Sequence, residues 1–464
     1  MLLHVGVFYG ITVGWKMLRL SLYFLIFGSS MISSGEAVES PTIKAPWEVA
    51  ALKPSWSEVE AKRTRRLDYD SSLSVTGNGQ RLVDALAALV PGDRLVIAPG
   101  TYSLTRKCSL NLRGTAEKPI WIVGDNANGA VVITRPDARQ NVLNLGESSR
   151  SEYVALRNLE ITGGSTLIRF YDCQHIWLDR CHLHHSAAEG ITTNSRDTSY
   201  FFITGNHFHD FKEENATGEA MYLGGNHGKA VMSYSVIAGN HVHDCGGKQG
   251  DGIELKQGSH HNWIYKNHVH DTNYPCIIVY GTGGNGLNRI EGNLCYRSGD
   301  NTMQVQGEAV VCRNVLLAAE GAAFASTDHQ GKTSRLSVVH NTIVSSRRGV
   351  NLSSWNARDG MVLANNAIYT DRGEAIRFPA GAERVVVAGN VVTGNVSGVS
   401  SGFVSGVGLE DFVNVRWDGS QRDARIAKKS SLRRRGASEY AIAEDFIDNH
   451  YHDPPSSGAL AAVE

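Results

Sequence analysis

The sequence of 464 residues contains little proline (11 residues) and little cysteine (7), and its charges cancel, with 45 Lys and Arg against 46 Asp and Glu. Without a basic surplus there is no whole-protein field to recruit nucleic acid or an anionic membrane surface. Seven cysteines without short repeated spacings do not indicate a disulfide framework, so we expect small buried side chains. Glycine is abundant, at 49 residues.

Long hydrophobic runs are also missing, apart from one at the N-terminus. Two basic residues precede the apolar run Leu20–Phe27, and Gly35-Glu36-Ala37 offers a small-x-small cleavage site. This order predicts a secretory signal over residues 1–37, starting at Met1 or Met17. An uncleaved anchor is the alternative, but the run is shorter than the ~20 residues of a membrane span. We therefore expect a secreted protein with no membrane association after signal cleavage.

An asparagine recurs through the middle of the chain, between short β-rich runs. It occurs at Asn158, Asn206, Asn240, Asn267, Asn293, Asn314, Asn341, Asn366 and Asn390, with Cys181 in its place in one further copy. The steps run from 21 to 34 residues, and the longest implies an insertion, which we place in Lys212–Thr217. A period of this size built from strands without helices is typical of a solenoid.

We predict an all-β fold, a right-handed parallel β-helix of about ten coils over residues 73–400. Buried Asn side chains would stack from coil to coil and satisfy one another and the turn backbone. Leucine-rich repeats agree less well with the sequence, because the Leu framework is missing and Val, Ile and Thr dominate.

The ends of a solenoid need covers, since an exposed coil would pair with other strands. Residues Gln80–Leu89 place their apolar side chains on one helical face, which predicts an N-terminal capping helix. Residues 38–72, with two Trp and a basic run, are predicted to form an extended arm. Residues 401–464 lack the repeat and are predicted to fold back as a C-terminal cap.

The third strand of each coil carries the candidate chemistry. Alternation points the first and third residues of these strands inward, so the second and fourth point outward. The outward set is Arg169, Tyr171, Thr192, Asn194, Tyr222, Glu254, Lys256, Ile278, Tyr280, Gln304 and Gln306. Such a wall of aromatic, amide and charged groups is suited to a sugar chain, and we predict substrate contacts from Arg169, Tyr171, Asn194, Gln304 and Gln306. The alternative is an ordinary solvated sheet face.

Acidic residues precede these strands in consecutive coils. Glu189, Glu219 and Asp251 stand two residues before Ile191, Met221 and Ile253. Stacked carboxylates raise one another's pKa or hold a cation, and hard oxygen ligands favour Ca²⁺. We predict a calcium site formed by Glu189, Glu219, Asp251 and Glu254, against the alternative of separate turn residues that face solvent.

Histidines recur at i, i+2 spacing in four coils. The pairs are His182/His184, His207/His209, His241/His243 and His268/His270, and Asp210, Asp244 and Asp271 follow the last three. Stacked imidazoles beside carboxylates could bind Zn²⁺ or supply a general base. Recurrence on every coil favours stacking imposed by the fold over one selected site. We also predict that His184 contributes to substrate binding at the edge of the groove.

Three segments carry a resemblance to a known family. They are Val90 to Tyr102 (VPGDRLVIAPGTY), Gly114–Ile120 (GTAEKPI) and Asp251–Lys256 (DGIELK). They are similar to secreted right-handed β-helix proteins related to polysaccharide lyases, in particular the alginate lyase and chondroitinase B family. The resemblance implies that the coil of Asp251–Lys256 carries acidic calcium ligands and a catalytic Lys. The Arg that this family carries one coil later falls near Tyr280 here.

The resemblance implies cleavage of an acidic, uronate-containing polysaccharide by β-elimination. Separately, we expect the protein to be a monomer. Lys256 would remove the C5 proton, and Tyr280 or Tyr222 would protonate O4 or act as the alternative base. A reference pKa of ~10.4 is too high for this task, so a nearby cation or burial would have to lower it. Three alternatives stay open: a uronate C5-epimerase, a glycoside hydrolase that uses a carboxylate pair, and a non-catalytic carbohydrate-binding protein.

Overall fold

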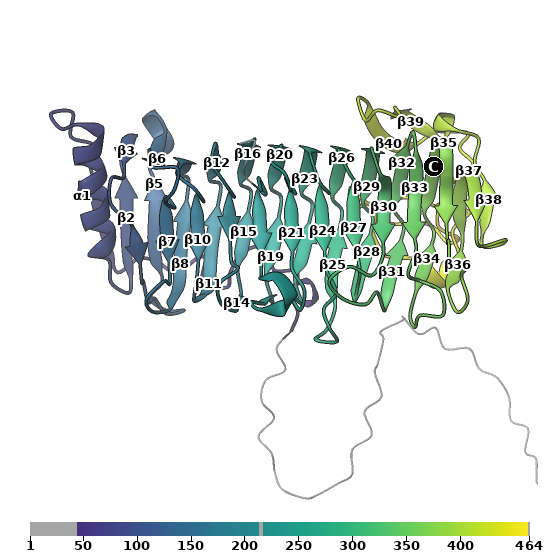
Figure 1. Cartoon of the computed structure of the whole chain (residues 1–464), viewed down its shortest axis with the longest axis horizontal. Helices are drawn as coiled ribbons and strands as arrows, with labels where there is room; N and C mark the ends of the chain where they lie inside the picture. Colours follow the sequence, from purple (N-terminus) through teal and green to yellow (C-terminus); the bar gives the residue numbers. More distant parts are fainter. Residues whose placement is uncertain (1–43, 213–216, 463–464) are drawn as a thin grey trace, which may run out of the picture. The chain divides into compact units, whose positions relative to one another are not determined.

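The computed structural model describes residues 44–212 and 217–462. The predicted signal, residues 1–37, lies outside the described residues, as does most of the predicted insertion (213–216). From residue 44 onward the chain forms parallel β-coils stacked one on another, with a helix at one end (Figure 1). In this described part, no helix is long and apolar enough to cross a membrane.

Each coil contributes strands to three parallel stacks. Stack one contains β1 (Arg63–Leu67), β2 (Asp93–Ile97), β5 (Ile120–Gly124), β8 (Ser151–Arg157), β11 (Cys173–Asp179), β15 (Phe202–Thr204), β19 (Val236–Ala238), β22 (Trp263–Tyr265), β25 (Asn288–Glu291), β28 (Ala309–Cys312), β31 (Leu336–Val339), β34 (Val362–Ala364) and β36 (Val386–Ala388). The short strands β14 (Thr198–Ser199) and β18 (Met232–Ser233) pair beside it.

Stack two follows the turn after stack one. It contains β3 (Gly100–Ser103), β6 (Val131–Arg135), β9 (Glu160–Gly163), β12 (His182–His184), β16 (His207–Phe211), β20 (His241–Cys245), β23 (His268–Thr272), β26 (Leu294–Ser298), β29 (Val315–Ala319), β32 (Thr342–Ser345), β35 (Ala367–Arg377), β37 (Asn390–Ser397) and β38 (Phe403–Ser405).

Stack three completes each coil. It contains β4 (Ser109–Leu110), β7 (Leu143–Leu145), β10 (Ile168–Phe170), β13 (Ile191–Thr192), β17 (Met221–Leu223), β21 (Ile253–Leu255), β24 (Ile277–Val279), β27 (Met303–Val305), β30 (Ala322–Ser326) and β33 (Arg348–Leu352). The long strands β35 and β37 run on from stack two into stack three.

One apolar core fills the interior of the coils from end to end. Inward side chains of all three stacks, such as Ile122, Val242 and Ile277, are fully or almost fully buried in it. All seven cysteines are buried and free, which confirms that they serve as small core side chains.

The helix α1 (Val75–Ala87) closes the first coil, as predicted from its apolar face. It begins after Ser74, whose hydroxyl accepts a hydrogen bond from the Gly77 amide, and this cap starts the helix five residues before Gln80. Leu82 and Leu86 are buried against the core. Gly79 allows the close approach, because a Cβ there would lie 2.1 Å from the carbonyl oxygen of Ser103 in β3.

The predicted asparagine ladder forms at the turn between stacks one and two. Along it, each side-chain oxygen accepts hydrogen bonds from the backbone amide and the side-chain amide of the Asn one coil before, at 2.9–3.0 Å. Cys181 takes the ladder position in its coil and donates its backbone N–H to Asn206 Oδ1.

Asn158 does not belong to the ladder, contrary to the prediction. Its neighbour Leu159 stands at the ladder position, because Glu160 pairs with His182, the residue after Cys181. Asn158 instead occupies the turn residue before that position, with a φ of 55°. Asn tolerates this left-handed conformation, so the same residue type marks two different places in the repeat.

Residues before the predicted helix contribute more than an arm. β1 lies within residues 38–72 and pairs with β2, so the first coil begins before residue 73. The segment before β1 packs on the outer side of stack one, where Trp56 meets Trp121 and Trp177 at 5.7 and 6.3 Å between ring centroids. The first coils have no ladder Asn, so a count of coils by Asn misses them.

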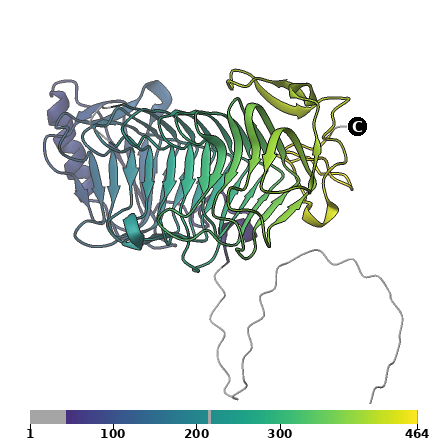
Figure 2. The ribbon, with the colours of Figure 1, turned by 45° about the vertical axis from the view of Figure 1, so that its right-hand side comes forward.

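The C-terminal segment folds back along the flank of the later coils (Figure 2). Its antiparallel hairpin is formed by β39 (Phe412–Val415) and β40 (Arg422–Ile426), and Phe412 packs on Tyr369 of β35. Asp411 is fully buried and accepts a 2.6 Å hydrogen bond from the Tyr369 hydroxyl. The segment thus covers the side of stack two at this end of the solenoid.

Candidate functional site

The outward face of stack three has the register predicted from the sequence. Ile168, Ile191, Met221, Ile253, Ile277 and Met303 are paired in succession and point inward. Tyr222, Glu254, Ile278 and Gln304 therefore stand side by side on the outside. The next outward position is held by Lys256, Tyr280 and Gln306 in consecutive coils.

A groove of about 510 Å³ lies over this face. Its floor is formed by Glu254, Lys256, Ile278, Tyr280 and Gln304. Asp251, in the turn before β21, also lines the groove. Its walls are Asn226, Gln249, Tyr274, Pro275, Asp300 and the loop Thr327–Gln330. None of these wall residues was predicted, because they come from turns whose distance from the floor depends on how the coils stack.

Lys256 and Glu254 form the centre of the groove. They are 4% and 3% exposed, and the Lys256 ammonium makes an ion pair with the Glu254 carboxylate. The ammonium also lies 4.3 Å from the ring centroid of Tyr222 and 5.1 Å from that of Tyr280. A buried cation between two aromatic faces and one carboxylate is held in a defined place on the floor.

Glu219 and Asp251 add two buried carboxyl groups near the ion pair. Burial, reinforced by the charges of Glu254 and Glu189, raises the pKa of Glu219 to about 7. Burial, together with the charges of Glu254 and Glu219, raises the pKa of Asp251 well above its usual value. Within the described residues, Glu219 Oε2, Asp251 Oδ1 and Glu254 Oε2 are buried oxygens without a hydrogen-bond partner.

The two tyrosines beside Lys256 are held as neutral phenols. Burial, followed by the charge of Glu254, raises the pKa of both Tyr222 and Tyr280. The Tyr280 ring lies 5.6 Å from that of His329, which reaches over the groove from a loop two coils further along the chain. His329 was not predicted, since no motif marks it in the sequence.

Gln306 binds the loop that carries His329 and does not line the groove. It is fully buried, and its amide donates to the carbonyl oxygen of His329 and accepts from the Gly281 amide. The amide nitrogen and the amide oxygen of Gln306 are therefore both hydrogen-bonded within the protein, so this side chain does not line the groove. Gln304, in contrast, lines the groove.

The remaining predicted residues lie elsewhere on the coils. Arg169 donates to Asn194 Oδ1 at 2.9 Å and lies 5.2 Å from the ring centroid of Tyr171, several coils before Lys256 on the same stack. Glu189 accepts a hydrogen bond from Thr166 and stands one coil before Glu219. His184 stands on stack two, where it contacts Glu160, and is not among the residues that line the groove.

Comparison with known proteins agrees with this architecture. Residues 142–288 and 219–368 match the family described as the right-handed β-helix region. The chain is therefore a right-handed parallel β-helix protein, and the expected resemblance to β-helix proteins of the polysaccharide lyase type is confirmed for the fold.

Several solved structures are similar to this chain at low sequence identity. Pectate lyase Pel9A is 14% identical, with a TM-score of 0.51, over 88% of this chain and 98% of that one. The alginate lyase AlyGC of family PL6 is 12% identical, with a TM-score of 0.47, over 86% of this chain and 59% of that one. A point mutant of the periplasmic alginate epimerase AlgG is 14% identical, with a TM-score of 0.35, over 74% of this chain and 84% of that one. No curated protein matches the sequence.

Proposed function

We propose that the protein is a secreted carbohydrate-active enzyme that cleaves an acidic, uronate-containing polysaccharide by β-elimination. The observation that carries the proposal is the buried Lys256 on the floor of an open polar groove, flanked by two tyrosines and by carboxylates with unpartnered oxygens. The similarity to pectate lyase Pel9A supports the fold on which the proposal rests.

Elimination from a 4-linked uronate removes the C5 proton and breaks the bond between C4 and O4, which leaves a C4–C5 double bond. Lys256 would take the C5 proton, for which its ammonium must first lose a proton and leave the ion pair with Glu254. Tyr280 would give a proton to O4, because its phenol is protonated and faces the same groove. Tyr222 is the alternative donor.

The donor set suits a calcium ion. Glu219, Asp251 and Glu254 each present an unpartnered buried oxygen, and Lys256 neutralises one of the three carboxylates. Hard oxygen donors with surplus negative charge are the ligands that Ca²⁺ prefers. When bound, the ion would neutralise the substrate carboxylate and so acidify the C5 proton. Glu189 would add charge from one coil away, and Arg169, Tyr171, Asn194 and Gln304 would contact more distant sugar units.

The direct test is absorbance of the unsaturated uronate on alginate, pectate, chondroitin, dermatan and heparan chains, with Ca²⁺ or with chelator. We expect a rise on one chain class, its loss in chelator, and its loss in Lys256→Ala. Lys248→Ala is the matched control, since Lys248 is an exposed lysine of the same coil. A flat trace on all chains would refute elimination of these substrates; reducing ends without absorbance would indicate hydrolysis, and inverted C5 centres epimerisation.

A further inference from the structure

The predicted histidine ladder forms on the outside of stack two, away from the groove. His182, His207, His241 and His268 are paired in one row, and His184, His209, His243 and His270 in a second. Neighbouring rings within each row stack with centroids 4.6–5.1 Å apart and planes within 14° of parallel. Tyr296 stacks on His270 at 4.7 Å and ends the ladder.

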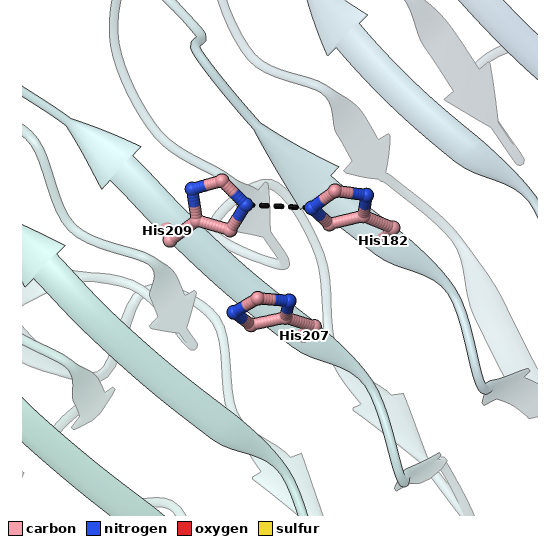
Figure 3. Close-up of side chains that lie close together, drawn as sticks. All are labelled: His182, His207 and His209. Carbon is pink, nitrogen blue, oxygen red and sulfur yellow. Dashed lines mark hydrogen bonds between the residues drawn. The ribbon is translucent and has the colours of Figure 1, made fainter.

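The two rows also meet on the diagonal, nitrogen to nitrogen. His182 Nε2 lies 2.6 Å from His209 Nε2, and His207 Nε2 lies 2.8 Å from His243 Nε2. Figure 3 shows the first of these contacts, with His207 beside it. Ring nitrogens of His182, His207 and His209 lie within 4.8 Å of one another, and the same holds for two further triplets, His207/His241/His243 and His241/His268/His270.

A carboxylate stands behind each histidine of the second row from His209 onward. His209 Nδ1 contacts Asp210 Oδ2 at 2.6 Å, and the Asp244 and Asp271 carboxylates contact His243 and His270 in the same way, at 2.6 and 2.5 Å. A φ of 54–59° at each of these Asp residues turns the carboxylate back onto the preceding ring.

These carboxylates fix the tautomer. Because the Nδ1–H group donates a hydrogen bond to the carboxylate, the neutral ring has its lone pair on Nε2. This is the atom that faces the neighbouring histidine. The carboxylates are themselves held by cations, since Lys212 bridges Asp210 and Asp244, at 3.0 and 2.9 Å, and Arg297 pairs with Asp271. Ring stacking alone requires neither the facing nitrogens nor these carboxylates.

The rings are also in the protonation state that binds metals. Burial and the neighbouring imidazoles lower the pKa of His207 to about 3 and those of His241 and His268 to about 4. Desolvation thus favours the neutral form of the rings of this crowded row, and a first-row Nε2–H that donates to the facing Nε2 would have to move to Nδ1 for that Nε2 to ligate a metal.

We propose that this histidine ladder binds divalent transition-metal ions, with Zn²⁺ as the reference ion, through three imidazole nitrogens at each site. Imidazole donors select Zn²⁺, Cu²⁺ or Ni²⁺ over Ca²⁺, so the ladder and the carboxylates of the groove would take different ions. Zn–N bonds of ~2.0–2.1 Å require the facing nitrogens to separate by roughly 0.5 Å. The half-buried rings allow this movement by side-chain rotation.

The number of ions that the ladder can bind depends on which histidines the triplets share. The triplets His182/His207/His209 and His241/His268/His270 have no member in common, whereas the middle triplet shares one histidine with each. Two ions can therefore occupy the three-histidine triplets without sharing a ligand. Because the ladder ties adjacent coils together, bound metal would stabilise the folded chain by mass action.

The first experiment is Zn²⁺ titration of the purified, chelator-treated protein by equilibrium dialysis and calorimetry, with the melting temperature measured in parallel. We expect two Zn²⁺ per chain, a higher melting temperature, and no displacement by Ca²⁺. The variant His207→Gln/His241→Gln removes one or two ligands from every triplet and should lose both ions. Its matched control is His260→Gln/His261→Gln, a histidine pair beside stack one, where His260 pairs with Ser233 of β18.

Three further measurements separate metal binding from an effect on folding. Asp210→Asn with Asp271→Asn should keep two ions but weaken affinity about 10–100-fold, since these are positioning residues. On the unmutated protein, Zn²⁺ should protect the ladder histidines from diethyl pyrocarbonate and leave His260 and His261 reactive. The groove variant Glu254→Gln should bind Zn²⁺ unchanged, whatever happens to its polysaccharide activity. No Zn²⁺ uptake by the unmutated protein, or full uptake by His207→Gln/His241→Gln, would overturn the proposal.

Discussion

Replacing Asn293 by alanine tests how much the asparagine ladder contributes to stability. Asn293 Oδ1 accepts hydrogen bonds from the backbone and side-chain amides of Asn267, at 2.9 and 3.0 Å. Its own amide donates to the Ile264 carbonyl and to Asn314 Oδ1. In Asn293→Ala, two buried N–H groups of Asn267 lose their acceptor.

The expected cost follows from those two groups. A buried donor left without a partner costs about 1–3 kcal/mol, so Asn293→Ala should lower the free energy of unfolding by about 2–6 kcal/mol. Urea unfolding followed by far-ultraviolet circular dichroism measures this. Asn158→Gly is the control, because Asn158 lies in the left-handed turn outside the ladder, where Gly is tolerated; we expect a change within about 0.5 kcal/mol.

Two results would refute the reasoning. A loss below about 1 kcal/mol in Asn293→Ala would mean that the freed amides find other partners, so that the ladder is not a main source of stability. An equal loss in Asn158→Gly would mean that the register assigned to the first Asn is wrong.

Three further predictions concern charge and tethering. Burial lowers the pKa of His207 to about 3 and that of His268 to about 4, below the unfolded value near 6.5. With chelator present, the melting temperature should therefore fall as the pH drops from 6.5 toward 4. A melting temperature that stays constant over this range would mean that the rings titrate normally. The pKa of Glu219 is raised to about 7, so its ionised form opposes folding and stability is lost as the pH rises from 4.5 to 7. Glu219→Gln should therefore stabilise the metal-free protein above pH 7 by up to about 3 kcal/mol. Below pH 4.5 the substitution should leave the stability unchanged. Tyr369→Phe removes the 2.6 Å hydrogen bond to Asp411 and should cost about 1.5–3 kcal/mol, with faster proteolysis of the β39–β40 hairpin; an unchanged cleavage rate would argue against the tether.

Much of the fold could be predicted because the coil repeats its pattern. The inward positions of stack three follow from alternation alone, and Ile253 pairs with Met221 and Ile277 as the sequence indicates. Asn158 was assigned to the ladder because Asn occurs both in the ladder and in left-handed turns. These two positions are adjacent in the sequence, so the residue type alone does not distinguish them.

The site was less predictable than the coils. Glu254 and Lys256 could be placed in one groove because they sit two apart on one strand. His329 could not, since its position over Tyr280 depends on a loop of a coil two further along and on Gln306, which holds that loop. A polar residue at an outward position is also not always exposed, because such loops can fold over it.

The uniform bonds of the asparagine ladder make whole coils interchangeable during evolution. Asn240 bonds to Asn267, and Asn267 to Asn293, with the same atoms and nearly the same lengths. A gene duplication or deletion of one whole coil would therefore rejoin the ladder without a defect. The groove has no such freedom, because it combines neighbouring coils with a loop from further along. Changes in length should thus accumulate toward the two ends of the solenoid, while the coils around Lys256 keep their number and order.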